Sequence, residues 1–263
     1  FALSLNVVSA KIYDIAGGEA IVRFASEVTG VEAGRFQNDP TLSLGTTEFT
    51  PLEMASGFSV FAGRGFRVEP HAIREIRDSS GKVIYMAEGR FKKRRVMDER
   101  TAFIMTSLMR EVVDSGTAAY GIRRSGGFTL PCAGKTGTNT GFRDAWFIGF
   151  TPGLSVAVWI GCESPEFSLG SGQSGASCAA PVWGRFMSRV SQVRKRSYFA
   201  SRPEGVTAQH ICTVTGKLPD KNCTSRIEYF ISGTEPREKC DGLHGRLSNV
   251  KELIMRDGKG EER

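Results

Sequence analysis

The sequence predicts an α/β (α+β) sandwich in which helices cover a mostly antiparallel sheet. Two apolar segments, residues 145–150 and 154–161, are joined only by Thr151-Pro152-Gly153. Because that link is too short for a crossover, the two strands should pair antiparallel. Their near-continuous apolar character indicates that both faces of the sheet are covered. A helix beginning near Pro181 offers such cover. The residues expected on its buried side are Trp183, Phe186, Met187, Val190 and Val193.

The first sixty or so residues should hold two helices separated by a loop. Residues 7–12 should begin a short helix, and we expect it to end at Gly17-Gly18. Residues 18–43 show no strong apolar period, so we expect a loop there with at most a short helix. The second helix should begin at Thr50-Pro51-Leu52-Glu53, because Thr50 can cap it, proline suits the first helical position and Glu53 can close a capping box. Its apolar stripe, which we assign to the core, consists of Met54, Phe58 and Phe61.

A hairpin and a longer helix come next. Residues 72–76 and 83–86 flank Asp78-Ser79-Ser80-Gly81, a pattern typical of a hairpin with a tight turn. Asp98 should then cap a helix whose apolar residues recur near helical spacing until Gly116.

Composition narrows the function classes. The 263 residues leave room for one large domain and an appendage. The net charge of +7 is concentrated in two short basic runs, which a solvated face explains better than nucleic-acid binding, and no nucleic-acid motif is present. There is no signal peptide, and no apolar run reaches the roughly eighteen residues that a membrane helix needs. We therefore expect no membrane segment within this chain.

The chemistry centres on Gly134-Lys135-Thr136-Gly137-Thr138. If this segment is a strand, Lys135 and Gly137 share one face, and Thr136 and Thr138 the other. A strand edge that offers an ammonium, hydroxyls and free N–H groups suits a carboxylate or an acyl oxyanion. The segment also resembles the end of a phosphate-binding loop. We reject that alternative, because the first glycine of that motif would fall at Thr129 and because a turn follows in place of a helix.

A second motif supports acyl transfer. Ser4-Leu5-Asn6 is an S-x-N motif that precedes Lys135-Thr136-Gly137, the order used by penicillin-recognising serine acyltransferases. With these motifs, the chain resembles the transpeptidase domain of class A (bifunctional) penicillin-binding proteins. The resemblance runs from residue 1 to about 190 and resumes near 230. The segments that carry it are residues 44–55, 144–152, 179–183 and 230–236.

That resemblance implies a fold and an activity. The fold would be that of penicillin-binding-protein transpeptidases and β-lactamases, with a helical lobe that carries S-x-N. The activity would be that of a serine D,D-transpeptidase, which cross-links peptidoglycan stem peptides and is acylated by β-lactams, without any cofactor. The roles implied for matching residues are a proton path for Ser4, substrate-amide binding for Asn6 and positive charge near Ser4 for Lys135. The residues implied for binding the substrate carboxylate and oxyanion are Thr136, Gly137 and Thr138.

The nucleophile of that family is the serine of an S-x-x-K motif before S-x-N. We expect it to lie outside this chain, which starts three residues before Ser4. Two formal matches exist downstream, Ser79 with Lys82 and Ser248 with Lys251. The first lies in a predicted turn and the second follows the K-T-G segment, so neither is expected to be the nucleophile.

The resemblance also implies a setting: the extracytoplasmic, periplasmic face of the bacterial inner membrane. The parent protein would carry an N-terminal glycosyltransferase domain and a membrane helix. We expect residues 1–200 to belong to the transpeptidase domain and residues 201–263 to form a cysteine-containing extension. A non-catalytic binding or scaffold protein of the same fold in cell-wall assembly is the alternative, and an S-x-x-K just upstream of Phe1 would favour the enzyme.

The six cysteines fall into two groups. Cys132, Cys162 and Cys178 have apolar or small neighbours, so we expect buried thiols. The other three lie in the polar extension. There we expect a Cys212–Cys223 disulfide, which an extracytoplasmic setting permits, and no metal. The alternative is a zinc site made of Cys212, Cys223, Cys240 and His244, although the close cysteine pair usual in such sites is missing.

Overall fold

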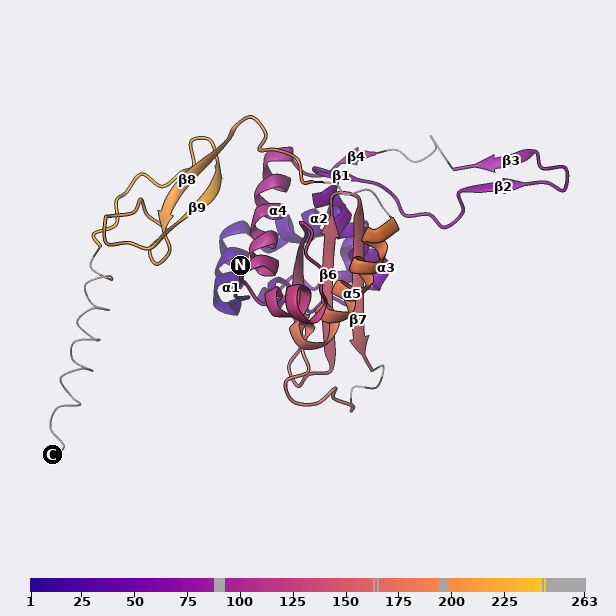
Figure 1. The fold of residues 1–263 in the computed structure, drawn as a ribbon, viewed down its shortest axis with the longest axis horizontal. Helices are drawn as coiled ribbons and strands as arrows, with labels where there is room; N and C mark the ends of the chain where they lie inside the picture. Colours follow the sequence, from indigo (N-terminus) through magenta and orange to yellow (C-terminus); the bar gives the residue numbers. More distant parts are fainter. Residues whose placement is uncertain (88–92, 163, 165, 194–197, 243, 245–263) are drawn as a thin grey trace. The chain divides into compact units, whose positions relative to one another are not determined.

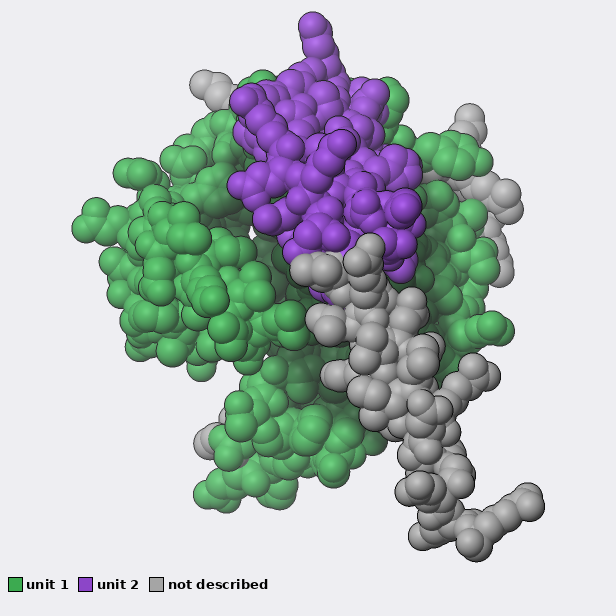
Figure 2. All heavy atoms as spheres, turned by 90° about the vertical axis from the view of Figure 1, so that its left-hand side faces the viewer, with its two compact units in different colours: residues 1–201 green, residues 202–263 purple. Residues whose placement is uncertain are grey.

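The computed structural model describes residues 1–87, 93–162, 164, 166–193, 198–242 and 244. The chain divides into two compact units, unit 1 with residues 1–201 and unit 2 with residues 202–263 (Figure 2). In the described parts, no helix is both long enough and apolar enough to cross a membrane.

The central sheet of unit 1 has the strand order β5-β6-β7 (Figure 1). Its strands are β5 (Ala133–Thr138), β6 (Asp144–Thr151) and β7 (Leu154–Gly161). Both neighbouring pairs are antiparallel, which confirms the prediction from the short link at Thr151-Pro152-Gly153. Within the described residues β5 lies at an edge of this sheet, so the K-T-G segment has one side without a strand partner.

Helices cover both faces of the sheet, as its apolar strands predict. On one face, Phe147 of β6 packs edge-on against Trp183 of α5 (Ala180–Val193), with ring centroids 5.3 Å apart. On the other face, Phe150 of β6 stacks with Phe61 of α3 (Pro51–Ala62), and Met109 of α4 (Glu99–Asp114) joins the same cluster. The sandwich fold is therefore confirmed. One detail is wrong, because Phe186 of α5 is exposed whereas Trp183 and Met187 are buried.

Capping explains where two of these helices begin. At α3 the Thr50 side chain accepts the Glu53 N–H, and the Glu53 carboxylate accepts the Thr50 N–H, which is the predicted capping box. Asp98 caps α4 by accepting the Arg100 N–H at 2.9 Å. The predicted hairpin also forms, from β2 (Glu75–Arg77) and β3 (Val83–Met86).

The expected loop at residues 18–43 is largely helical. α1 (Asn6–Ala16) leads at Gly17 into α2 (Gly18–Thr29), which ends at Gly30 in the left-handed conformation with φ 77°. The prediction was wrong because Ile21, Phe24, Ala25 and Val28 do recur at helical spacing, although glycine or polar residues at both ends hide the pattern. Two short 3-10 turns follow, η1 (Ala33–Arg35) and η2 (Pro40–Leu44).

The remaining elements are shorter. β1 (Phe66–Arg67) pairs antiparallel with β4 (Arg94–Arg95). Two π-helical turns, η3 (Tyr120–Ser125) and η4 (Gly175–Ala179), pack near α5. In unit 2, β8 (Val206–Cys212) pairs antiparallel with β9 (Ser225–Ile231).

Candidate active site

The two sequence motifs meet in space. The ammonium of Lys135, on β5, donates a hydrogen bond to the Ser4 hydroxyl, and a second one to the Thr136 carbonyl oxygen at 3.0 Å. The Phe1 ring lies beside the same ammonium, 6.0 Å from Nζ to the ring centroid. Residues 131 positions apart therefore form one polar centre at the open edge of the sheet.

Burial sets the protonation behaviour of Lys135. Removal of the ammonium from water disfavours its charged form and lowers the pKa of Lys135 from its ordinary value. A lysine with a lowered pKa exchanges a proton more readily near neutral pH than a solvated one does. Because its hydrogen-bond partner is the Ser4 hydroxyl, this arrangement can hold or pass a proton at Ser4 Oγ.

Ser4 owes its position to an unusual backbone conformation. Its φ is 53°, in the left-handed region that non-glycine residues seldom adopt, and its N–H donates to the Phe1 carbonyl at 3.0 Å. Ser4 does not cap α1, because the N-cap position is held by Leu5, which makes no side-chain cap bond. The hydroxyl is thus directed to Lys135. Asn6 is the first residue of α1 and its side chain is exposed.

The hydroxyls of Thr136 and Thr138 both have protein partners. Thr136 Oγ1 lies 2.8 Å from Thr117 Oγ1, and Thr138 Oγ1 accepts the Gly175 N–H at 2.9 Å. A hydroxyl carries one donor and two acceptor positions, so Thr138 keeps its O–H free to donate to an anion. If Thr117 donates to Thr136, the Thr136 O–H is also free. With that donor direction, both hydroxyls can serve an anionic ligand at the strand.

Two glycines hold the strand edge in place. A Cβ on Gly137 would come 3.1 Å from the Trp146 Cβ, and a Cβ on Gly175 would come 2.5 Å from the Gly137 carbonyl oxygen and 2.2 Å from that of Trp146. Gly175, the first residue of η4, thus lies so close to the backbone of β5 and β6 that no side chain fits at this position. This contact fixes the end of β5 where Thr138 lies.

Thr117 was missed by the sequence analysis. It lies just after α4. Its N–H donates to the Ala2 carbonyl at 3.2 Å, and its hydroxyl contacts the Thr136 hydroxyl. One residue therefore connects the N-terminal segment that carries Ser4 with the strand that carries Lys135. The only sequence signal was its place after Gly116, which ends the preceding helix.

Only one of the two formal S-x-x-K matches lies in the described residues, and it does not form the helical motif. Ser79 lies in the turn of the β2–β3 hairpin, where the Asp78 N–H donates to the Lys82 carbonyl at 3.0 Å, so Lys82 is not one helical turn from the serine. Ser248 and Lys251 lie outside the described residues.

The cysteines differ from expectation in two respects. Cys132 is buried, and burial raises the pKa of its thiol to about 12, so it is an inert core residue. Cys162 and Cys178 were also expected to be buried, but Cys162 is exposed and Cys178 is only half-buried. Cys212 and Cys223 are free thiols, so the expected disulfide is not formed in this structure. Both instead approach His244, which also lies close to Cys240, so the four residues named in the alternative to the disulfide come together.

Two models of known protein families match nearly the whole described chain. Residues 16–188 match the family model of the penicillin binding protein transpeptidase domain. Residues 202–244 match that of the penicillin-binding protein 1A C-terminal domain.

Penicillin-binding protein 1A of Aquifex aeolicus is 32% identical over 246 residues, covering 94% of this chain and 32% of the relative. Its counterpart in Pseudomonas aeruginosa is 28% identical, covering 81% of this chain and 31% of the relative. The chain spans about a third of the length of the curated relatives it matches.

Solved structures agree with the family. The crystal structure of penicillin-binding protein 1A from Haemophilus influenzae matches with a TM-score of 0.80 and 27% identity, over 91% of this chain and 40% of that one. The PonA1 protein from Mycobacterium tuberculosis in complex with penicillin V matches with a TM-score of 0.60 and 20% identity, over 72% of this chain and 54% of that one, a likeness of fold alone.

Proposed function

This chain belongs to the penicillin-binding protein transpeptidase family, and on that premise we propose that it is part of a serine D,D-transpeptidase that cross-links peptidoglycan stem peptides. One observation carries the proposal: Lys135 of the K-T-G strand donates a hydrogen bond to Ser4 of the S-x-N motif. This contact brings together the two groups of residues that such chemistry needs beside a nucleophile. The comparisons give no support to the scaffold alternative.

The reaction has an acylation and a transfer step. The nucleophile is the serine of an S-x-x-K motif, which we place outside residues 1–263. Its oxygen attacks the carbonyl carbon before the terminal D-Ala, and the bond to the D-Ala nitrogen breaks. The serine proton passes to the departing amine, with the Ser4 hydroxyl in the path. An amine of a neighbouring stem peptide then attacks the acyl-enzyme carbonyl, the bond to the serine oxygen breaks, and a proton from the amine returns to that oxygen.

Residues of this chain stabilise the charges that develop. Lys135 keeps a hydrogen-bond donor on Ser4 Oγ while the proton moves. The hydroxyls of Thr136 and Thr138 bind the carboxylate of the terminal D-Ala, and Gly137 leaves room for the peptide along the edge of β5. The N–H of Thr138 donates to the oxyanion formed at the attacked carbonyl. Asn6, exposed at the start of α1, holds the substrate amide.

The proposal extends to the setting of the whole protein. It places the site at the extracytoplasmic, periplasmic face of the bacterial inner membrane. The parent protein then carries an N-terminal glycosyltransferase domain and a membrane helix. It also assigns catalysis to the region up to about residue 200 and leaves the cysteine-containing extension outside the chemistry. The two compact units and the two family matches support that boundary.

Acylation by a β-lactam tests the proposal, because the drug reacts at the same serine. In the complete protein, Lys135→Ala should slow labelling by a fluorescent penicillin on the order of 100-fold, the scale seen when one donor to a reacting centre is removed. The matched control is Lys82→Ala, which removes an exposed lysine in the β2–β3 turn. Circular dichroism and thermal unfolding establish that both variants fold. Unchanged labelling in folded Lys135→Ala protein would exclude the lysine from the chemistry.

A further inference from the structure

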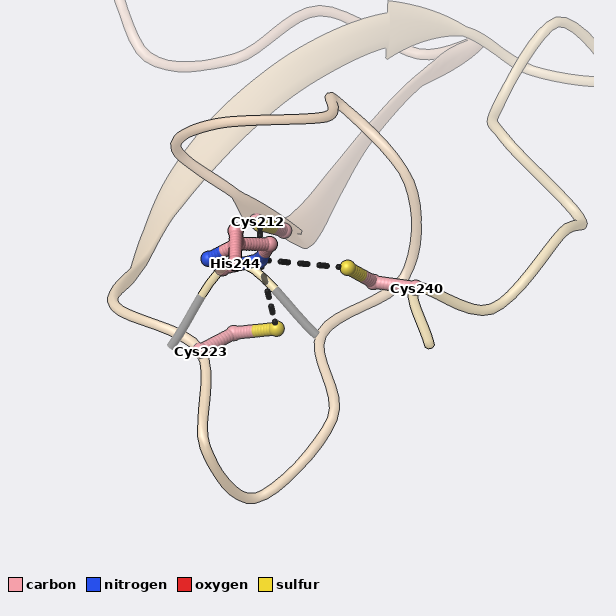
Figure 3. A group of neighbouring side chains, drawn as sticks. All are labelled: Cys212, Cys223, Cys240 and His244. Carbon is pink, nitrogen blue, oxygen red and sulfur yellow. Dashed lines mark hydrogen bonds between the residues drawn. The ribbon is translucent and has the colours of Figure 1, made fainter. Parts of the chain in front are cut away.

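Four side chains of unit 2 converge on one point (Figure 3). The ring nitrogen Nε2 of His244 lies 3.1 Å from Cys212 Sγ, 3.2 Å from Cys240 Sγ and 3.5 Å from Cys223 Sγ. All four atoms lie within 4.8 Å of one another. The residues come from three separate segments of the chain, so local spacing alone does not explain their meeting.

Hydrogen bonding does not account for this arrangement. One nitrogen of a neutral imidazole is either a donor with a single N–H or an acceptor with a single lone pair. It can therefore satisfy one of three sulfur atoms at hydrogen-bond distance, but not all of them. If three sulfurs and one nitrogen bind the same cation, in contrast, each sulfur lies close to the nitrogen.

The distances fit a tetrahedral ion. With bonds of about 2.3 Å to sulfur and 2.0–2.1 Å to nitrogen, a tetrahedral zinc ion separates its sulfur and nitrogen ligands by about 3.6 Å and its sulfur ligands by about 3.8 Å. The three sulfur-to-nitrogen distances are 3.1, 3.2 and 3.5 Å, so the ligand atoms would need to move apart by at most about 0.5 Å to reach this geometry. We propose that Cys212, Cys223, Cys240 and His244 bind one zinc ion in a tetrahedral Cys₃His site.

The backbone of unit 2 presents the first and third cysteines together. After β8 the chain reverses within six residues, because the Gly216 N–H donates to the Cys212 carbonyl at 2.9 Å and Cys212 N–H donates to the Lys217 carbonyl at 2.8 Å. Gly216 allows this turn with a φ of 70°. The Cys240 N–H then donates to the Leu218 carbonyl at 2.8 Å, so the segment carrying Cys240 and His244 lies along the end of that turn.

Backbone N–H groups also point at the sulfurs. Asp220 N–H donates to Cys223 Sγ at 3.3 Å, and Gly242 N–H donates to Cys240 Sγ at 3.5 Å. Donors of this kind stabilise thiolates, the form that binds metal, and orient them as outer-shell groups do. Gly242 is suited to its place, because its φ is 69° and a Cβ there would come 2.7 Å from the Asp220 carboxylate.

The site would be structural. Four protein ligands leave no open position for a substrate, unlike the three-ligand arrangement of catalytic zinc. Unit 2 also has little apolar core to hold it together. Its buried hydrophobic residues, within the described range, are Val206, Ile211, Cys212 and Cys240, and the last two are ligands. A small domain with such a core commonly depends on a metal for its folding.

Metal analysis of the intact chain tests the site. The protein is purified under reducing conditions, exposed to zinc chloride, freed of excess metal by gel filtration and measured by elemental mass spectrometry. About one zinc ion per chain is expected. Reloading with cobalt(II) should give intense sulfur-to-cobalt charge-transfer bands and the strong visible bands of tetrahedral cobalt. This readout needs no variant and no enzyme activity. Octahedral cobalt bands, or zinc far below one ion per chain, would overturn the proposal.

Matched variants locate the ligands. Cys240→Ser and His244→Ala should weaken zinc binding by more than the 10- to 100-fold typical of outer-shell changes. The controls are Cys162→Ser and His71→Ala, which alter an exposed cysteine and an exposed histidine of unit 1. Chelation of wild-type protein should also speed cleavage by trypsin within unit 2, at the exposed residues Lys217 and Lys221. A Cys212–Cys223 disulfide found by mass spectrometry of unreduced protein without bound zinc would refute the site, as would equal zinc binding by all four variants.

Discussion

Lys135 donates a hydrogen bond to Ser4 across 131 positions of sequence. Neither residue is held there by its own element alone. Ser4 lies in a left-handed backbone conformation just before α1, and Lys135 lies on the open edge of β5. Thr117 contacts both partners' segments, through the Ala2 carbonyl on one side and the Thr136 hydroxyl on the other. The site is therefore a junction of three segments, and it should respond to changes in any of them.

The first prediction concerns that junction. Thr117→Val removes the hydroxyl that contacts Thr136 but keeps the backbone bond to Ala2. We expect a stability loss of about 1 kcal/mol, the typical contribution of one hydrogen bond. We also expect β-lactam acylation of the complete protein to slow by about tenfold, since about 1.4 kcal/mol corresponds to a factor of ten.

Thr106→Val is the control for this experiment. Thr106 lies within α4 and is buried. Its hydroxyl donates to the Ala102 carbonyl oxygen of the same helix, at 2.8 Å. It should lose similar stability without slowing acylation. Equal acylation rates in the two variants would show that Thr117 contributes to the fold only.

The second prediction concerns the close approach of η4 to the sheet. Gly175→Ala places a methyl group against the carbonyl oxygens of Trp146 and Gly137, and neither backbone can yield cheaply. We expect a loss of roughly 1–3 kcal/mol, the usual cost of overpacking, measured by chemical denaturation. Gly34→Ala is the control, because a Cβ there meets nothing within 4 Å. Equal stability of the two variants would mean that η4 can move away freely.

The third prediction is a pH dependence. The guanidinium of Arg35 first, and then the Thr50 N–H, lower the pKa of the Glu53 carboxyl in the folded chain. A carboxyl with a lowered folded pKa adds stability above its unfolded value, about 4.3, and loses it as the pH falls through the folded value. Glu53→Gln should therefore cost about 1 kcal/mol at pH 7, a typical capping contribution, and progressively less below pH 4.

Denaturation at several pH values measures this difference. Glu19→Gln is the control, since it also removes a carboxylate from the first turn of a helix, α2, but an exposed one. A cost of Glu53→Gln that stays constant from pH 7 to the acid range would contradict the assigned role of its charge.

The fourth prediction is that residues 1–263 by themselves form no covalent adduct with a penicillin. Ser79 is held in a hairpin turn, and the motif serine of the family is placed outside these residues. Incubation with fluorescent penicillin followed by a denaturing gel should show no labelled band, whereas the complete protein should label. A band on the chain alone would identify a nucleophile within it, and peptide mapping would then locate that residue.

Local signals predicted much of the fold. Thr50, Pro51 and Glu53 specify the start of α3 through bonds between near neighbours, so the sequence shows them directly. The antiparallel pairing of β6 and β7 followed from the short link between them. α2 was missed because its apolar stripe is bounded by glycines and polar residues, and its packing against α3 is a tertiary effect.

The site was predictable only where a motif carried it. Ser4, Asn6 and Lys135 came from recognisable patterns and their order. Thr117 and Gly175 belong to no motif, since they matter through contacts with segments distant in sequence. The four residues of the cysteine cluster were predicted only as the alternative to a disulfide. Their one close pair along the chain is a cysteine and a histidine, Cys240 and His244, whereas the usual zinc motif has two neighbouring cysteines.

The long sequence separation between Ser4 and Lys135 has a consequence for how the protein folds. Contacts between distant segments form only after a large loop has closed, which is entropically costly and slow. Molecules stalled with a formed sheet but an undocked N-terminal segment would have native-like secondary structure and no acylation site. In the complete protein, penicillin labelling during refolding would therefore follow the last docking event, and it should lag behind the recovery of circular dichroism.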